Sequence, residues 1–362
     1  MNNIKINKIT CIGLLLLIPM SGFSQDATIN KPEKNFYALW TELNDHYAFF
    51  EEKSVDWDMI YKKYSPKIKS NTTNDQLFSI FCDMLGELDD GHVSLSDKKT
   101  GKKFSSGKKA YFLQEFPTQD SLRLMLNTID ATLKTKGFND LIYHKMKIPY
   151  LNNNIIAYTN NERYGYLRIN LMIGISKKKL NNILDSVVES FRNLGGIIID
   201  VRFNSGGYDK YSYQIANRFT DEKRVGHYKC TKKAEGFSEL KTWYLEPTGA
   251  NPIAKPIILL TSDLSRSATD VFALAMKELP YVTIVGDNTY GIFSDIKELK
   301  LPNKWHFTFS GQKYLSTEMK NYEGIGVSPD IKLLNTKNNI KDGFDPLLLE
   351  ALKLLNQNAI DN

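Results

Sequence analysis

The sequence lacks most of the features that would assign it quickly to a special class of protein. It has three cysteines in 362 residues, with no spacing typical of a zinc site or a redox motif. Its 22 glycines and 12 prolines are too few for a collagen-like or low-complexity chain. The formal net charge of +6 is small and spread along the chain, whereas a nucleic-acid partner usually requires a concentrated basic face. A globular protein of about two domains is therefore expected.

Long apolar runs are also absent, except at the N-terminus. Lys5 and Lys8 precede an apolar stretch over 12–20 that is too short to span a bilayer. Small residues follow it at Gly22 and Ser24. This order is typical of an export signal, so we expect a signal peptide over 1–24, cleaved near Ser24 and Gln25. The mature protein is then expected to be periplasmic or secreted, with no membrane span.

Two cysteines remain after that cleavage, Cys82 and Cys230. An oxidising compartment would permit one disulfide between them. Cys82 lies in an apolar helical pattern, which fits a buried free thiol at least as well. The sequence leaves both possibilities open.

Residues 26–92 are predicted to form a helical subdomain. Apolar side chains recur there at helical spacing in three stretches, and Gly91 ends the pattern. These side chains include Phe36, Leu39, Trp40 and Leu43; Trp57, Ile60 and Tyr64; and Leu77, Phe78, Phe81, Met84 and Leu85. Residues 93–162 alternate weakly in polarity, which predicts a β-rich connecting segment.

Residues 163–335 are predicted to form an α/β core. Short, almost uniformly apolar runs alternate with helical patterns, as expected for a mainly parallel sheet covered on both faces. The strands are expected over 164–172, 197–202, 256–262 and 281–286, and the helices over 180–191, after Gly207, and over 268–279. A C-terminal helix and tail over 336–362 follows, opened by Asp345 and Pro346.

Three loops carry residue types suited to acyl transfer, which needs a nucleophile, a base and hydrogen-bond donors for an oxyanion. Ser267 opens a helix after a buried strand, and the amide of Ala268 is unpaired in such a position. Gly206 and Gly207 follow another buried strand and allow close backbone approach. His92 follows Gly91 at an abrupt break. Singly, each feature is more often a helix cap, a turn or a structural histidine.

Together these segments resemble the family of tail-specific, or C-terminal processing, peptidases and the tricorn core protease. The resemblance rests on LGELDDGHVSL (85–95), YGYLRI (164–169), GGIIIDVRFNSGG (195–207), SRSATDVFALAMK (265–277), VGDNTYG (285–291) and YEGIGVSPDI (322–331). It implies a crotonase-like α/β core and serine-type peptide hydrolysis. Ser267 then corresponds to the nucleophile, and Gly206 or Gly207 with Ala268 to the oxyanion hole. No PDZ-like segment is recognisable before residue 163.

The choice of branch within the family depends on the residues around the nucleophile. Ser-Lys members place a lysine just after the Thr-x-Gly motif, where this chain has Ile292. The tricorn-like branch uses a histidine and a glutamate, and His92 and Glu323 occupy those positions. That branch also carries a serine before the histidine, where this chain has Gly91, so the group that supports Glu323 is open. Ser94 is one candidate.

The resemblance therefore implies an exported serine peptidase with Ser267, His92 and Glu323 as nucleophile, base and orienting acid. Peptides or unfolded proteins are the expected substrates, and no metal or organic cofactor is needed. The alternative is a catalytically silent binding protein on the same fold, as in the interphotoreceptor retinoid-binding proteins, which resemble this family. The joint presence of nucleophile, base and acid favours the enzyme.

Overall fold

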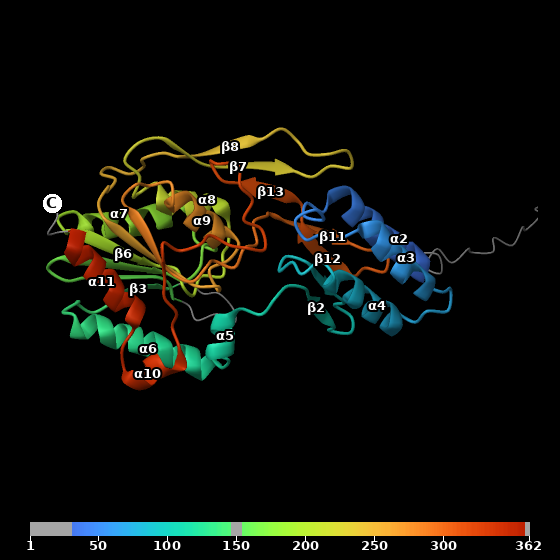
Figure 1. Ribbon diagram of the computed structural model, residues 1–362, viewed down its shortest axis with the longest axis horizontal. Coiled ribbons are helices and arrows are strands. Elements are labelled where there is room, and N and C mark those ends of the chain that lie inside the picture. The colour runs from blue at the N-terminus through green and yellow to red at the C-terminus, as the bar shows by residue number, and fades with distance from the viewer. Residues whose placement is uncertain (1–30, 146–153, 359–362) are drawn as a thin grey trace, which may run out of the picture.

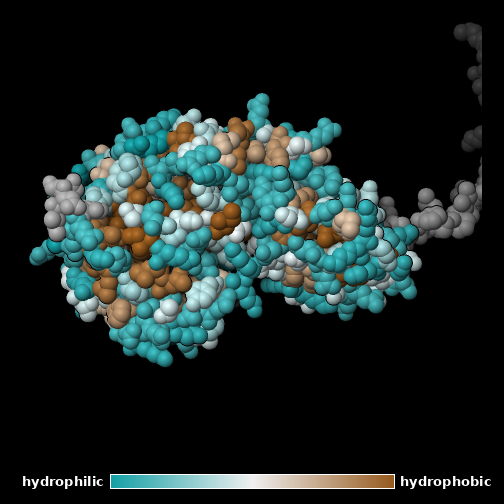
Figure 2. All heavy atoms as spheres, in the orientation of Figure 1, coloured by the Kyte–Doolittle hydropathy of each residue, from teal (hydrophilic) through white to brown (hydrophobic). Residues whose placement is uncertain are grey.

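The computed structural model describes residues 31–145 and 154–358. These residues form two bodies, and each body contains segments from both ranges (Figure 1). The larger is an α/β body and the smaller combines helices with a short sheet. The predicted signal peptide lies outside the described residues. No helix within these residues has both the length and the apolar character needed to cross a bilayer. The face shown in Figure 2 is mostly hydrophilic, with a notch between the two bodies along its lower edge.

The larger body is built around a seven-stranded sheet, in the order β14-β10-β9-β6-β5-β4-β3. Five of its strands are parallel neighbours, and β3 and β4 add an antiparallel edge. This confirms the mainly parallel sheet expected from the apolar runs. The strands are β3 (Ile142–Lys145), β4 (Asn154–Asn160), β5 (Tyr164–Ile169), β6 (Gly196–Asp200), β9 (Ile257–Thr261), β10 (Val282–Gly286) and β14 (Ile331–Lys332).

Helices cover both faces of this sheet, which is why its central strands are apolar throughout. Successive residues of a strand point to opposite faces, so Ile197 and Ile199 belong to one core and Ile198 to the other. The first core is closed by α7 (Lys177–Phe191), α8 (Asp209–Ala216) and α9 (Ala268–Met276). The second is closed by α6 (Gln119–Thr135) and α11 (Pro346–Asn358), with the short α10 (Lys337–Asp342) nearby.

The segment 93–162 was expected to be β-rich, and its described residues form four strands but also two helices. It contains α5 (Tyr111–Glu115) and the seventeen-residue α6. Met125, Ile129 and Leu133, spaced four apart, are buried in the second core, so packing of this face selects a helix. The interleaved threonines obscured the pattern because β-branched residues favour strands. Thr128 and Thr132 instead bond their hydroxyls to the carbonyls four residues earlier.

The smaller body contains the predicted helices α2 (Pro32–His46), α3 (Trp57–Tyr64) and α4 (Asn74–Gly86). A 3-10 turn, η1 (Ser65–Lys67), directly follows α3. Its boundary, however, is not at residue 92. These helices pack on a four-stranded sheet of β1 (Ser94–Ser96), β2 (Lys103–Ser105), β11 (Ile296–Lys300) and β12 (His306–Ser310). The hairpin β11–β12 lies within the predicted peptidase core of 163–335 but packs in the smaller body, because the helices need a second layer to bury their apolar faces.

A three-stranded sheet runs above α8 and α9 toward the smaller body (Figure 1). It consists of β7 (Arg224–Thr231), β8 (Lys241–Leu245) and β13 (Gln312–Leu315), in the order β13-β7-β8. The chain passes from β12 to β13 through Gly311 alone, so the hairpin of the smaller body continues directly into this sheet.

Candidate active site

Ser267 lies in the turn between β9 and α9, where the parallel strands end. Its backbone has φ 59° and ψ −123°, a conformation that a non-glycine residue adopts only when its surroundings hold it there. Ser267 donates its backbone N–H to Oδ2 of Asp270 at 2.6 Å. The side chain remains partly accessible, while Ala268 beside it is buried. The turn therefore presents the serine hydroxyl outward from a fixed backbone.

Asp270 holds this turn against the Thr-x-Gly segment. Its carboxylate also accepts the backbone N–H groups of Gly291 at 2.8 Å and Ile292 at 3.2 Å. Burial raises the pKa of Asp270 to about 6 despite these hydrogen bonds. Since this one carboxylate connects both loops, Asp270 fixes the backbone geometry of Ser267.

His92 approaches Ser267 from the loop between α4 and β1. Its Nε2 lies 3.2 Å from Oγ of Ser267, so the structure brings together the predicted nucleophile and base. The backbone of His92 is held at both ends: its N–H donates to Oδ1 of Asp90 at 2.8 Å, and its carbonyl accepts from Oγ1 of Thr308 at 2.6 Å. The imidazole is thereby fixed in reach of the serine hydroxyl.

The imidazole of His92 is buried, and this controls its charge. Burial lowers the pKa of His92 below its ordinary value of 6.5, because it disfavours the protonated ring. Asp90 and Asp295 oppose this shift and Arg266 adds to it. A neutral imidazole at pH 7 can accept the proton of Ser267, as a general base must.

The two candidate glycines of the oxyanion hole differ in what their amides do. Gly206 donates its N–H to Oδ1 of Asn204 at 2.8 Å, so this donor is already used. Within the described part of the chain, the N–H groups of Gly207 and Ala268 have no protein acceptor. Gly206 is needed for close approach instead: a Cβ there would lie 2.8 Å from Cβ of Ser267. The geometry therefore favours Gly207 and Ala268 as the donor pair.

Glu323 does not make the contact expected of an orienting acid. No hydrogen bond between Glu323 and His92 occurs in the described structure. Its Oε2 accepts the backbone N–H of Phe293 at 2.7 Å, and its Oε1 lies 3.6 Å from Nζ of Lys53. Burial, with the nearby charge of Asp90, raises the pKa of Glu323 well above its usual range. The carboxyl group thus lies in an environment that favours its protonated form.

The ring atom of His92 that Glu323 was expected to bind faces Ser310. Oγ of Ser310, at the end of β12, lies 3.3 Å from Nδ1 of His92. Ser310 was not identified from the sequence, although the alternation of phenylalanine with hydroxyl residues over 307–310 was a possible signal. Ser94, the suggested support for Glu323, bonds its hydroxyl to that of Thr308 at 2.7 Å instead.

Gly91 and Ile292, the two positions at which the chain differs from the motifs of the two branches, lie next to each other. A Cβ on Gly91 would lie 3.3 Å from the ring of Tyr290 and 3.4 Å from Cδ1 of Ile292. The two side chains therefore occupy the space beside Gly91. Ile292 is buried and has no group that could act as a base.

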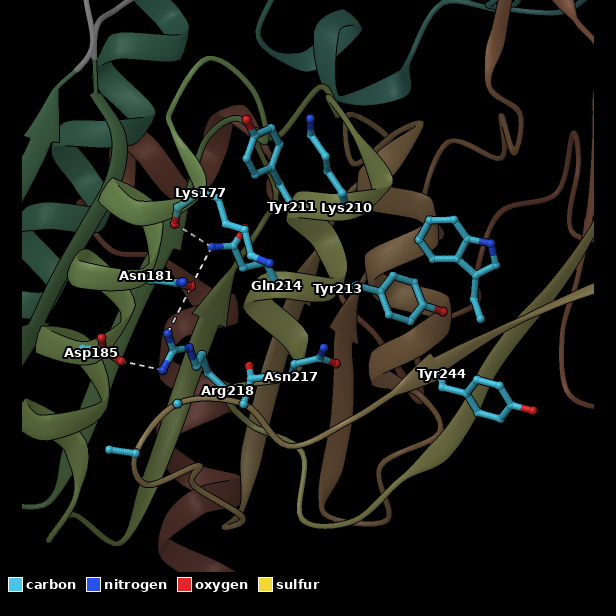
Figure 3. A pocket seen from close by; sticks show the side chains of 14 residues that line it. Lys177, Asn181, Asp185, Lys210, Tyr211, Tyr213, Gln214, Asn217, Arg218 and Tyr244 are labelled. Carbon is cyan, nitrogen blue, oxygen red and sulfur yellow. Dashed lines mark hydrogen bonds and ion pairs between the residues drawn. The ribbon is translucent and has the colours of Figure 1, made fainter.

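Other chemically active groups lie away from this site. Cys82 and Cys230 are free thiols. No group of three or more His, Cys, Asp or Glu side chains is placed to hold a metal within the described ranges. A cavity of about 820 Å³ lies between α7, α8 and β8 (Figure 3), but its lining includes none of the loops that carry Ser267, His92 or Gly207.

Comparison with known proteins places the chain among peptidases. Residues 163–333 match the model of peptidase family S41, and residues 30–86 match the tricorn protease C1 domain. The chain is 27% identical to the tricorn protease of Thermoplasma volcanium over 234 residues, which cover 60% of this chain and 20% of that protein. It is 21% identical to a carboxyl-terminal-processing protease of Picosynechococcus sp. over 244 residues, covering 67% and 53%. The matched part of the chain thus spans a fifth of the length of the first relative and about half of the length of the second.

A solved structure is similar over nearly its whole length. The crystal structure of a peptidase candidate from Parabacteroides merdae has a TM-score of 0.73 and 28% identity, covering 90% of this chain and 96% of that one. Crystalline tricorn protease, at 16% identity and a TM-score of 0.51, supports the fold alone. The expected crotonase-like fold class is confirmed, and the chain carries a peptidase family S41 domain over 163–333 and a tricorn protease C1 domain over 30–86, with homologues among the tricorn and carboxyl-terminal processing proteases.

Proposed function

We propose that this protein is a serine-type peptidase that cleaves peptide bonds through an acyl-enzyme on Ser267. The observation that carries the proposal is the 3.2 Å contact between Oγ of Ser267 and Nε2 of a buried His92. His92 takes the hydroxyl proton as the oxygen attacks the carbonyl carbon, then gives it to the leaving amine. Water releases the acyl group by the same route. The free N–H groups of Gly207 and Ala268 stabilise the oxyanion in both steps.

The substrate is proposed to be a peptide or an unfolded protein with an apolar residue near the cleaved bond. A cavity of about 610 Å³ adjoins the oxyanion loop through Phe203 and Ser205. Its other lining residues include Leu122 and Leu126 of α6, as well as Leu171 and Leu264. The wall also carries the polar residues Gln119, Arg123, Asn154 and Asn170, so the cavity suits an aliphatic side chain on a polar peptide backbone. The mechanism uses no metal or organic cofactor, and export is proposed from the signal-like N-terminus.

A fluorophosphonate probe tests the proposal directly, since it reacts only with an activated serine. We expect labelling of the wild-type protein, mapped to Ser267 by mass spectrometry, and none of Ser267→Ala. Ser186→Ala removes an exposed serine hydroxyl from α7, away from the site, and serves as the matched control, which should still label. A folded wild-type protein that neither labels nor cleaves a peptide library would instead support the silent binding protein.

A further inference from the structure

Alternate side chains of β12 point to opposite faces of the strand, one facing a hydrophobic core and the other facing His92. Phe307 and Phe309 point into the core of the smaller body. Thr308 and Ser310 alternate with them and so face the other way, toward His92. Thr308 holds the carbonyl of His92, and Ser310 lies against Nδ1 of its ring. One strand therefore fixes both the backbone and the imidazole of the base.

We propose, on the basis of the function above, that Ser310 is the positioning residue of His92, in the place where an acid was expected. Its hydroxyl oxygen accepts a hydrogen bond from Nδ1–H. The proton of the neutral ring is then on Nδ1, and Nε2 presents its lone pair to Ser267. Without an acceptor at Nδ1, the proton can move to Nε2, and the ring would then donate to Ser267 instead of accepting from it.

Ser310 is held firmly enough for this task. It is fully buried, and its carbonyl accepts the backbone N–H of Ala48 at 3.0 Å. In the sheet it pairs with Ile296 of β11. The backbone of Ser310 is thus fixed, and its hydroxyl can change position only by rotation of the side chain. The separation of 3.3 Å between Oγ and Nδ1 is at the long end for a hydrogen bond.

The acids nearby make no hydrogen bond to the imidazole ring, and Oδ2 of Asp90 and Oε1 of Glu323 have no hydrogen-bond partner among the described residues. Asp90 uses Oδ1 to accept the backbone N–H of His92, and Glu323 uses Oε2 to accept that of Phe293. The charged groups that act on the imidazole are Asp90, Asp295 and Arg266. They influence its charge through space, whereas Ser310 is the partner of Nδ1 within hydrogen-bonding distance. The Ser310 hydroxyl can thus select the tautomer of His92, while the charged neighbours determine how readily the ring is protonated.

Nitrogen NMR of the histidine rings tests the proposal without requiring turnover. We expect the wild-type His92 to carry its proton on Nδ1 at pH 8, and Ser310→Ala to show a mixture of tautomers or Nε2–H. Ser310→Thr retains the hydroxyl and should restore the wild-type state. Ser316→Ala removes another buried serine hydroxyl, one that accepts from Glu318 and Lys320, and should leave the His92 signals unchanged. Identical His92 tautomers in wild type and Ser310→Ala would overturn the proposal, whether or not the protein cleaves peptides.

Kinetics give a second, separate measurement. In Ser310→Ala we expect kcat to fall about 10- to 100-fold with little change in KM, as for one lost hydrogen bond to a charged group. The acidic limb of kcat/KM should move to lower pH, because the hydroxyl stabilises the protonated ring more than the neutral one. A loss of active protein alone would lower the rate without moving this limb, and that result would contradict the proposal. Failure of the wild type to label at Ser267 would instead remove the proposed function and leave the tautomer result to stand alone.

Discussion

Nε2 of His92 lies 3.2 Å from Oγ of Ser267, although the two residues are 175 positions apart and belong to different parts of the fold. Ser267 opens a helix of the α/β body. His92 lies at the edge of the smaller body, where β12 holds it. The site is therefore complete only when the two bodies are correctly packed, and a change that loosens their contact should lower activity before it unfolds either core.

His92→Ala is expected to lower turnover by a factor on the order of 10³ or more, since the nucleophile loses its base. Kinetics on any cleaved peptide, together with a thermal melt, measure the effect. His306→Ala is the matched control, because His306 also lies on β12 but pairs with Glu298 at 3.1 Å, away from Ser267. A folded His92→Ala enzyme with wild-type turnover would show that another group is the base.

The pH dependence of kcat/KM should reflect the burial of His92. Because burial lowers its pKa below 6.5, the ring loses its proton at a lower pH than an exposed histidine does. Activity should therefore rise with pH, with a midpoint below pH 6.5. Initial rates at low substrate concentration between pH 4 and 8 measure the midpoint. A midpoint above 6.5 would mean that a nearby carboxylate dominates the site.

Much of the α/β body could be predicted from the sequence because burial on both faces gives strands an unambiguous signal. The run over 197–202 is apolar at nearly every position, and its strand β6 is buried throughout. Helix α6 was missed because its apolar side chains alternate with threonines, and only packing against the sheet selects the helix. The hairpin β11–β12 was missed as part of the smaller body because its partners lie some two hundred residues earlier in the chain.

The predictability of the site follows the same division. Ser267 and His92 lie in local motifs, so the resemblance could identify them. Ser310 lies in no motif and acts only through tertiary contact. The difference between Gly206 and Gly207 also depends on tertiary structure, since Asn204 engages one amide and not the other. For Glu323, position in the motif did not indicate which atoms its carboxyl contacts.

Glu323→Gln is expected to retain turnover within about tenfold of wild type. The motif alone suggests a much larger loss, because an ionised acid would stabilise the charged imidazole. Burial raises the pKa of Glu323, which reduces the difference in charge between the native carboxyl group and the amide. The amide oxygen can still accept the N–H of Phe293. Steady-state kinetics and a melt decide this, and a loss of 10³-fold or more in a stable protein would restore Glu323 as an ionised catalytic acid.

Ile292→Leu should leave most of the activity, since Ile292 only fills space beside Gly91 and Tyr290. A swap of similar volume in a buried position usually costs less than about 1.5 kcal/mol of stability. A melt and peptide kinetics measure both effects. Loss of turnover without loss of stability would indicate that position 292 contacts the substrate or the base.

His227 should make the protein sensitive to acid, independently of catalysis. Its ring stacks between Trp243 at 5.5 Å and Tyr314 at 5.0 Å, and its Nδ1 lies 2.6 Å from the hydroxyl of Tyr213. Burial, with a smaller effect from Lys229, lowers the pKa of His227 to about 3. An unfolded chain would protonate this residue near pH 6.5. Between these values the unfolded state binds more protons, so the free energy of unfolding falls as pH falls.

The decrease from this one residue is at most about 1.4 kcal/mol per pH unit, beginning below about pH 6.5. His227→Phe keeps an aromatic ring between Trp243 and Tyr314 but cannot take a proton. The variant should be about 1 kcal/mol less stable at pH 7, because the Tyr213 hydroxyl loses its partner. Its stability should nevertheless decline less steeply between pH 6.5 and 4. Urea denaturation at several pH values measures both slopes, and since His92 titrates in both proteins, the difference between them isolates His227. Parallel slopes would show that His227 does not remain neutral and buried in the folded protein.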